Sequence, residues 1–199
     1  MFGRKSRYRA LVVDARSSRA YHERCDRAPA SKPGRAQRTT EGDLVSERFP
    51  ISGPIDLRGQ VAIVTGAARG IGRAIALALA REGAIVVVAD VLPAEETVSE
   101  IHRRGGQAFA QNVDVTRDAD VVALVEATVA RYGRIDVLVN NAGVAARTGL
   151  EDTTLDLWQR DVGVILTGTF LVTRAVYPIM KRQGYGKIVN IASVSGKNG

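Results

Sequence analysis

The sequence predicts an α/β fold in which a parallel sheet carries helices on both faces, and two observations lead to this prediction. From residue 55 onward, short apolar runs bounded by Gly and Asp alternate with longer amphipathic stretches, as in repeated β–α units. The runs are apolar at nearly every position rather than at every second one, which is typical of strands buried on both faces of a parallel sheet. Both observations favour a doubly wound sheet.

The runs and the stretches between them place the elements in order along the chain. Strands are predicted at residues 61–65, 85–90, 107–113, 135–140 and 187–193. Helices are predicted at residues 70–82, 94–104, 118–132 and 154–182. The last helix carries apolar residues at roughly helical spacing, although Pro178 is expected to disturb its interior.

Residues 1–54 differ in composition from the rest of the chain. They are rich in Arg, Ser, Pro and Gly and show no periodicity beyond a short apolar run at residues 10–13, which predicts a disordered extension. Residues 1–50 contain 12 basic against 6 acidic residues, whereas the remainder contains 16 against 15. Most of the net charge of +7 therefore lies in this basic extension, and the folded domain is not expected to bind nucleic acid.

Cysteine usage and hydropathy indicate the compartment. Cys25 is the only cysteine, so no intramolecular disulfide forms, and the cytoplasm is the expected location. Purely apolar stretches such as residues 84–89 are far shorter than the roughly 20 residues that cross a bilayer, so no membrane contact is predicted. The acidic residues Asp14, Glu23 and Asp26 argue against an organellar transit peptide. No set of metal ligands is predicted.

A glycine-rich turn, Thr-Gly-Ala-Ala-Arg-Gly-Ile-Gly at residues 65–72, joins the first strand to the first helix. Its glycines allow a tight turn, a close approach of backbone N–H groups to a pyrophosphate, and packing of the helix on the strand. The helix N-terminus adds free donors and a positive dipole. The candidate cofactor-binding residues in this turn are Gly66, Arg69, Gly70, Ile71 and Gly72.

Asp90 ends the second strand, 20 residues beyond Gly70, where a carboxylate can accept hydrogen bonds from the adenosine ribose of a dinucleotide. This position predicts NAD as the cofactor, with NADP less favoured. Two alternatives stay open: Asp90 could only cap the following turn or helix, or Arg69 could attract the 2′-phosphate of NADP, which Asp90 would repel.

The spacing Thr-Gly-x-x-x-Gly-x-Gly resembles that of the classical short-chain dehydrogenase/reductase family, and further motifs follow in the family's order over residues 56–199. Asp114-Val115 looks like its adenine-contacting pair, and the run from Asn140 through Asn141 and Ala142 to Gly143 looks like its Asn-Asn-Ala-Gly element. Residues 166–170 and 188–193 resemble its fifth helix and fifth strand. The resemblance implies a Rossmann-type domain of strand order 3-2-1-4-5 over residues 55–199, incomplete at the C-terminus.

The resemblance also implies an NAD(P)-dependent oxidoreductase that moves hydride between a nicotinamide and a small-molecule alcohol or carbonyl substrate, of 3-oxoacyl, sugar or steroid type. Ser193 corresponds to the family's catalytic serine, although a hydroxyl at a strand end can also simply cap a turn. The family's Tyr-x-x-x-Lys lies roughly a dozen residues after that serine, whereas this sequence ends six residues after it. A chain truncated before the catalytic pair is therefore expected.

Two further departures from the family pattern bear on activity. Tyr177 and Lys181 have the spacing of the catalytic pair but precede Ser193, so we do not expect them to be catalytic. Ile165 stands where many members carry an asparagine that holds a water, and an aliphatic side chain cannot form that hydrogen bond.

The expected truncation has structural consequences. It would leave the apolar face of residues 154–182 partly uncovered and residues 187–193 as an unpaired sheet edge. The resemblance implies a homo-oligomer for a complete family member but not for this chain. Two alternatives to an enzyme stay open: a dinucleotide-binding fragment or pseudoenzyme without turnover, and a basic extension that binds an acidic partner.

Overall fold

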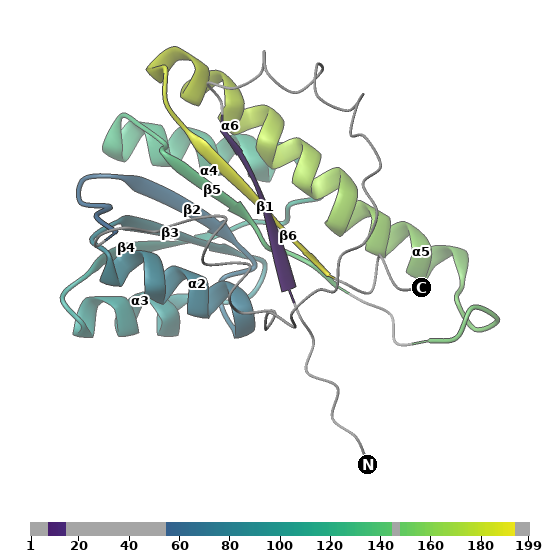
Figure 1. Cartoon of the computed structure of the whole chain (residues 1–199). Helices are drawn as coiled ribbons and strands as arrows, with labels where there is room; N and C mark the ends of the chain where they lie inside the picture. Colours follow the sequence, from purple (N-terminus) through teal and green to yellow (C-terminus); the bar gives the residue numbers. More distant parts are fainter. Residues whose placement is uncertain (1–7, 15–54, 145–147, 194–199) are drawn as a thin grey trace, which may run out of the picture.

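A single sheet of six strands runs through the described part of the chain, which comprises residues 8–14, 55–144 and 148–193 of the computed structural model. The strands are β1 (Tyr8–Asp14), β2 (Val61–Thr65), β3 (Ile85–Asp90), β4 (Gln107–Asn112), β5 (Val137–Asn140) and β6 (Lys187–Ser193). Their order is β1-β6-β5-β2-β3-β4, as Figure 1 shows. Strands β2 to β6 are parallel, and β1 pairs antiparallel with β6.

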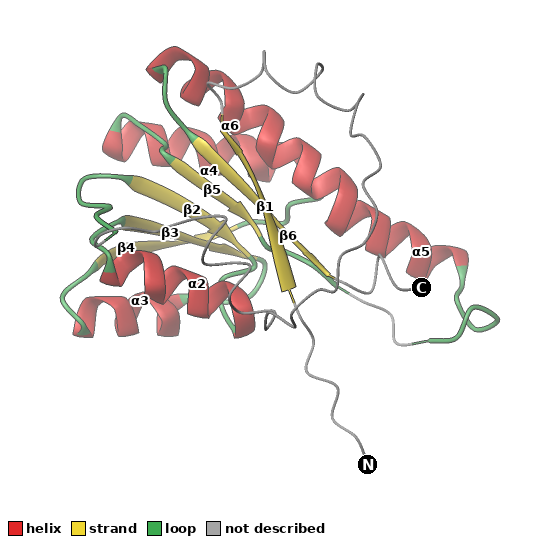
Figure 2. Cartoon of the chain, viewed as in Figure 1, coloured by secondary structure: helices red, strands yellow, loops and turns green. Residues whose placement is uncertain are grey.

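Helices cover both faces of this sheet (Figure 2). They are α2 (Gly70–Arg81), α3 (Glu95–Arg103), α4 (Asp118–Tyr132), α5 (Leu155–Val162), a π-helical segment η1 (Gly163–Gly168) and α6 (Thr169–Gln183). Helices α2 and α3 pack on one face, and α4 and α6 pack on the other. Counting the five parallel strands in chain order gives 3-2-1-4-5, so the predicted doubly wound Rossmann-type sheet is confirmed.

The two faces divide the apolar residues of each central strand between two cores. In β2, Val61 and Ile63 pack with the side chains of α4 and α6, whereas Ala62 and Val64 pack with those of α2 and α3. All four are buried, because successive side chains of a strand point to opposite faces and both faces are covered. This arrangement explains why the strand sequences are apolar throughout instead of alternating.

Strand β1 differs from the sequence prediction. It lies within the segment 1–54 that was predicted to be a disordered extension, and it pairs with β6 from Tyr8 opposite Ser193 to Asp14 opposite Lys187. The prediction that residues 187–193 form an unpaired edge is therefore wrong. An edge strand offers a row of free N–H and C=O groups to any extended segment, and the run Leu11-Val12-Val13 has a composition that favours strands. The rest of the predicted extension lies outside the described residues.

The predicted long helix is present but is not a regular α-helix throughout. It runs from α5 through η1 into α6, and Gly168 in η1 lies so close to the loop after β4 that a Cβ there would sit 2.6 Å from Val115 Cγ2. Such π-helical turns inside α-helices occur frequently at functional sites. The disturbance expected at Pro178 is not seen, because α6 continues through this residue to Gln183. A proline removes only one helical hydrogen bond, and the buried side chains of α6 keep the helix on the sheet.

The outer face of α5, η1 and α6 is apolar and exposed, as predicted from the sequence. Its exposed side chains are Leu155, Trp158, Ile165, Leu166, Phe170 and Tyr177. Among the described residues, the helix Leu155–Gln183 is also long and apolar enough to cross a membrane by length and composition. Its inner side chains Val172, Val176 and Met180 are fully buried in the core, which is typical of a helix that packs on a sheet.

A buried ion pair joins the strands at their amino-terminal ends. The Asp136 side chain, which is fully buried, accepts hydrogen bonds from the Val61 N–H (2.9 Å) and from Arg134 Nε (2.7 Å). The Asp136 backbone accepts from the Lys187 N–H (2.9 Å) and donates to the Val61 carbonyl oxygen (2.8 Å). The hydrogen bonds that Arg134 donates to Asp136 raise the pKa of the Arg134 guanidinium. One residue thus connects the starts of β2, β5 and β6.

Replacing Asp136 with alanine is expected to lower the free energy of unfolding by about 2 to 3 kcal/mol, because the buried Val61 N–H and the Arg134 guanidinium both lose their acceptor. Urea denaturation measures this change. The control is Asp56→Ala, which removes an exposed carboxylate paired with Arg58 and should leave the unfolding midpoint unchanged. Equal losses in the two variants would contradict the role of Asp136.

Candidate functional site

The loops that follow β2 and β5 meet at the carboxyl edge of the sheet. Strand β2 lies between β3 and β5. The chain adds β3 and β4 on one side of β2 and then β5 and β6 on the other, so the strand order reverses at β2. Ligands of doubly wound sheets bind at such a reversal. The predicted phosphate loop, residues 65–72, and the predicted Asn-Asn-Ala-Gly element, residues 140–143, occupy these two loops. The structure therefore brings together the two motifs that the sequence separates by about seventy residues.

Three glycines give the phosphate loop its shape, each for a different reason. Gly66 has a φ of +64°, and a Cβ on it would lie 2.8 Å from the Cα of Ala142. A Cβ on Gly72 would overlap the carbonyl oxygen of Gly66, so α2 can start close to the strand only without a side chain there. Gly70 has a φ of +59°, and a Cβ on it would meet no atom within 4 Å. The loop is thus tightly packed at Gly66 and Gly72 and open at Gly70.

Thr65 ties the two loops to each other. Its Oγ1 accepts hydrogen bonds from the backbone N–H groups of Asn141 and Ala142, both at 3.0 Å. In return, Asn141 Nδ2 donates to the carbonyl oxygens of Thr65 and Gly66, also at 3.0 Å. Sequence reasoning gave no role to Thr65. The only signal for it was the position of a hydroxyl residue at the end of a strand, directly before the first glycine of the loop.

The start of α2 offers free donors to an anion. The first N–H groups of a helix have no partner within it, and the residue before α2, Arg69, makes no side-chain cap. The first turn of α2 contains no acidic residue, whereas the first turns of α3, α4 and α5 all do. The N–H groups of Gly70, Ile71 and Gly72 therefore meet the positive end of the helix dipole without a competing carboxylate. Arg69 and Ile71 are both exposed beside them.

The carboxylate of Asp90 is 92% buried, with 8% of the residue exposed, at the end of β3. One of its oxygens accepts from the Ala68 N–H (2.8 Å) and the other from the Leu92 N–H (2.9 Å). Asp90 thus holds the turn after β3, as the alternative interpretation of the sequence had it, and it also holds the phosphate loop. Each carboxylate oxygen has two lone pairs, so each retains capacity for a ribose hydroxyl.

Asp114 and Val115 lie just beyond β4 at the same edge of the sheet. Asp114 Oδ1 accepts from the N–H (2.9 Å) and from the hydroxyl (2.7 Å) of Thr116, which shapes the loop before α4. Val115 is buried and packs on Gly168 of η1. The backbone of Asp114 is engaged as well, because its N–H donates to Asp120 Oδ2 (3.2 Å) and its carbonyl oxygen accepts from the Arg117 N–H (3.0 Å).

Ser193 is exposed at the end of β6, on the same edge of the sheet as the phosphate loop. Below it, Asn140 Nδ2 donates to Asn190 Oδ1 (2.9 Å) and to Thr173 Oγ1 (3.0 Å), which joins β5, β6 and α6. Tyr177 lines a groove of about 580 Å³ together with Asn190. Ile165 lies in η1 with half of its surface exposed.

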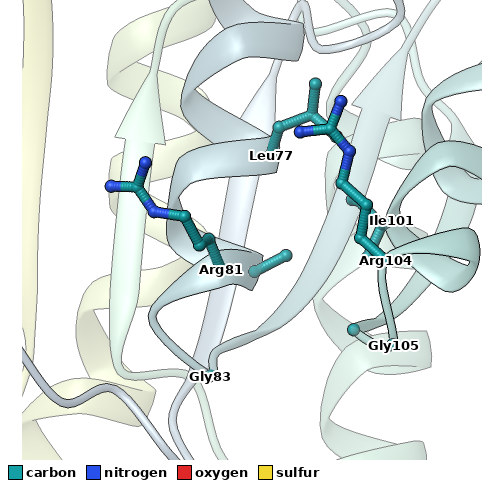
Figure 3. Close-up of a pocket in the computed structure, with 8 residues that line it drawn as sticks. Leu77, Arg81, Gly83, Ile101, Arg104 and Gly105 are labelled. Carbon is teal, nitrogen blue, oxygen red and sulfur yellow. The ribbon is translucent and has the colours of Figure 1, made fainter.

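A second hollow, of about 310 Å³, lies between the carboxyl ends of α2 and α3, at the opposite edge of the sheet (Figure 3). Its apolar floor includes Leu77 and Ile101, and Arg81 and Arg104 stand on its two sides. Arg81 forms an ion pair with Glu82, and Arg104 forms one with Glu100. This hollow is separate from the phosphate loop. Within the described ranges, no cluster of three or more His, Cys, Asp or Glu residues could hold a metal ion.

Comparison with known proteins gives consistent matches over the described domain. Residues 60–199 match the family model of short chain dehydrogenases. An oxidoreductase of Bacillus subtilis is 45% identical over 142 residues, which cover 70% of this chain and 55% of the relative. The 3-oxoacyl-[acyl-carrier-protein] reductase of Synechocystis is 46% identical over 146 residues, which cover 72% of this chain and 59% of the relative.

The fold is shared with solved structures as well. The crystal structure of a short-chain type dehydrogenase/reductase from Mycobacterium marinum superposes with a TM-score of 0.64 at 35% identity. The superposition covers 66% of this chain and 54% of that protein. The chain thus spans a little more than half the length of the proteins that it matches.

Replacing Thr65 with valine is expected to lower the free energy of unfolding by about 2 to 4 kcal/mol, because two backbone N–H groups lose a shared acceptor at once. The matched control is Thr128→Val. The buried hydroxyl of Thr128 only donates to a carbonyl oxygen of its own helix, Leu124 O at 2.7 Å, so its loss should be milder. Thr65→Ser should restore most of the stability in urea denaturation. A Thr65→Val variant as stable as Thr128→Val would show that the two loops do not depend on this hydroxyl.

Proposed function

Because this chain belongs to the short-chain dehydrogenase/reductase family, we propose that its domain binds NAD through the loops after β2, β3 and β5. The observation that carries the proposal is the start of α2, where free N–H groups, an open glycine and the absence of acidic residues occur together. An anionic pyrophosphate is the part of a dinucleotide that such a helix start stabilises. The hydrogen bonds of Thr65 support the proposal, since they hold this loop against the loop after β5.

The remaining candidate residues take their roles from their places around this loop. Asp90 is proposed to accept the adenosine ribose hydroxyls, and Asp114 and Val115 are proposed to lie against the adenine. Asn141, Ala142 and Gly143 would line the cleft on the other side of β2. Gly143 is exposed there, while Asn141 and Ala142 are half-buried and bonded to Thr65. NAD is preferred over NADP in this proposal, because a 2′-phosphate would meet the buried carboxylate of Asp90.

For the reaction, we propose hydride transfer between the nicotinamide and an alcohol or carbonyl substrate, as the family membership implies. Bound NAD supplies the hydride acceptor. Ser193, which is exposed at the end of β6, is proposed to donate a hydrogen bond to the reacting oxygen. The Synechocystis relative, a 3-oxoacyl-[acyl-carrier-protein] reductase, supports a carbonyl group as the reacting function without fixing the rest of the substrate. The cytoplasm is the proposed location.

A second candidate function is dinucleotide binding without turnover by residues 1–199. The favouring observation is the position of Tyr177 and Lys181, which lie in α6, with Tyr177 lining the groove beside Asn190. A serine hydroxyl alone is a poor base for the proton that alcohol oxidation releases and a poor acid for the proton that carbonyl reduction consumes. Production of NADH from NAD and simple alcohols by the 199-residue chain, followed by absorbance, separates the two candidates.

The 199-residue chain is expected to bind NAD at least about tenfold more tightly than NADP, a difference of about 1.4 kcal/mol. Asp90→Asn should reduce this preference, because it removes the charge that repels the 2′-phosphate while keeping the size of the side chain. Isothermal titration calorimetry with both cofactors measures it. The matched control is Asp114→Asn at the neighbouring strand end, which should change both affinities by the same factor.

Tighter binding of NADP than of NAD to the unmodified chain would overturn the role given to Asp90. Heat effects indistinguishable from those of dilution for both cofactors would overturn the binding proposal itself. If Asp90→Asn left the preference for NAD over NADP unchanged, another residue would have to distinguish the two cofactors, and Arg69 in the phosphate loop is the charged candidate.

A further inference from the structure

Thr97 is a fully buried polar residue that belongs to none of the recognised motifs. It lies in the first turn of α3, and its hydroxyl is 3.0 Å from the carbonyl oxygen of Ala68 and 3.2 Å from that of Ala67. Both carbonyls belong to the phosphate loop. The hydroxyl therefore donates out of its own helix, to a segment about thirty residues earlier in the chain.

Two other threonines of the described helices donate within their own helix. Thr128 in α4 and Thr169 in α6 each donate to the carbonyl four residues earlier, Leu124 O and Ile165 O, both at 2.7 Å. A threonine hydroxyl that bonds to its own helix finds a hydrogen-bond partner but does not link the helix to another part of the chain. Thr97 instead bonds to the phosphate loop, which the side chains of Asn141 and Asp90 also hold.

The bonds of Thr97 and Asp90 hold the same residue from two sides. The Ala68 N–H donates to Asp90 Oδ2 at 2.8 Å, and the Ala68 carbonyl oxygen accepts from Thr97. Because a peptide unit is planar and trans, the Ala68 carbonyl and the Arg69 N–H point in opposite directions. Fixing the carbonyl toward α3 therefore fixes the Arg69 N–H away from α3.

The same bond also removes a repulsive group from the site. A carbonyl oxygen carries partial negative charge, so it opposes an anion wherever it faces one. With the carbonyls of Ala67 and Ala68 turned to Thr97, the polar groups left for a ligand in this loop are N–H donors. Because the Thr97 hydroxyl holds these carbonyls in place, binding of an anion does not have to supply the free energy of turning them away.

We propose that Thr97 is a positioning residue for the pyrophosphate of the cofactor and that it orients the phosphate loop through the peptide between Ala68 and Arg69. The proposal rests on the dinucleotide binding proposed above. It extends the cofactor site to a residue of α3 that touches no cofactor atom. Together with Asp90, it makes the β3–α3 connection responsible for both the ribose contact and the shape of the phosphate loop.

The test compares Thr97→Val, Thr97→Ser and Thr128→Val in the 199-residue chain, with NAD, ADP and adenosine as ligands. Thr97→Val is expected to weaken NAD and ADP about threefold to tenfold, the effect of one hydrogen bond, and to leave adenosine within twofold. Thr97→Ser keeps the hydroxyl and should stay within twofold for all three ligands. Thr128→Val removes an equally buried hydroxyl elsewhere and should also stay within twofold.

Unchanged ADP affinity in Thr97→Val would overturn the proposal, and so would an equal loss for ADP and adenosine, which indicates general destabilisation. Amide hydrogen exchange of the ligand-free chain provides a second measurement. Thr97→Val should speed exchange at Ala68 several-fold relative to the amides of α4, and unchanged exchange would also overturn the proposal. If the unmodified chain binds no nucleotide but Ala68 exchange responds as expected, the binding proposal fails while the orientation of the loop by Thr97 holds.

Discussion

The arrangement of the site depends on one close approach, the contact between the loops that follow β2 and β5. At Gly66 the backbones of the two loops approach directly, because a Cβ there would lie 2.8 Å from the backbone of Ala142. Beside this point, the Thr65 hydroxyl accepts from two N–H groups across the contact. Because α2 starts directly after this contact, its first N–H groups are held at the reversal of the sheet. A larger side chain at Gly66 or Gly72 would push the helix start away from the edge.

The electrostatics of the site depend on which backbone N–H and C=O groups already form hydrogen bonds within the protein. The N–H groups of Ala67 and Ala68 donate to Ala89 and Asp90, and the corresponding carbonyls face Thr97. What remains exposed is the start of α2, whose donors have neither a side-chain cap nor an acidic neighbour in the first turn. In the proposed site, this arrangement favours an anion because the carbonyl oxygens of the loop face the protein, and no lysine or arginine in direct contact is required.

The features that could be predicted from the sequence are those determined by neighbouring residues, whereas features that depend on contacts between distant residues could not be predicted. Strands β2 to β6, α2, α3 and α4 follow from apolar runs and helical spacing, and the glycine turn follows from its neighbours in the chain. The π-helical segment could not be predicted, because it depends on the contact of Gly168 with Val115 across the domain. Strand β1 was missed because a short apolar run indicates no partner by itself. Thr65 and Thr97 act across 76 and about thirty residues, and no local pattern marks such contacts.

The two halves of the site are held by different parts of the fold, and this separation bears on function. The proposed binding half draws its contacts from β2, β3, β5, α2 and α3, and its hydrogen bonds close among those elements. Ser193 instead lies on β6, whose neighbours are β5 and the antiparallel β1. Since the two sets share only β5, changes beside β6 can be made without disturbing the hydrogen bonds of the phosphate loop. The proposed cofactor binding and the proposed hydride transfer therefore depend on different parts of the fold, and a measurement of one does not stand for the other.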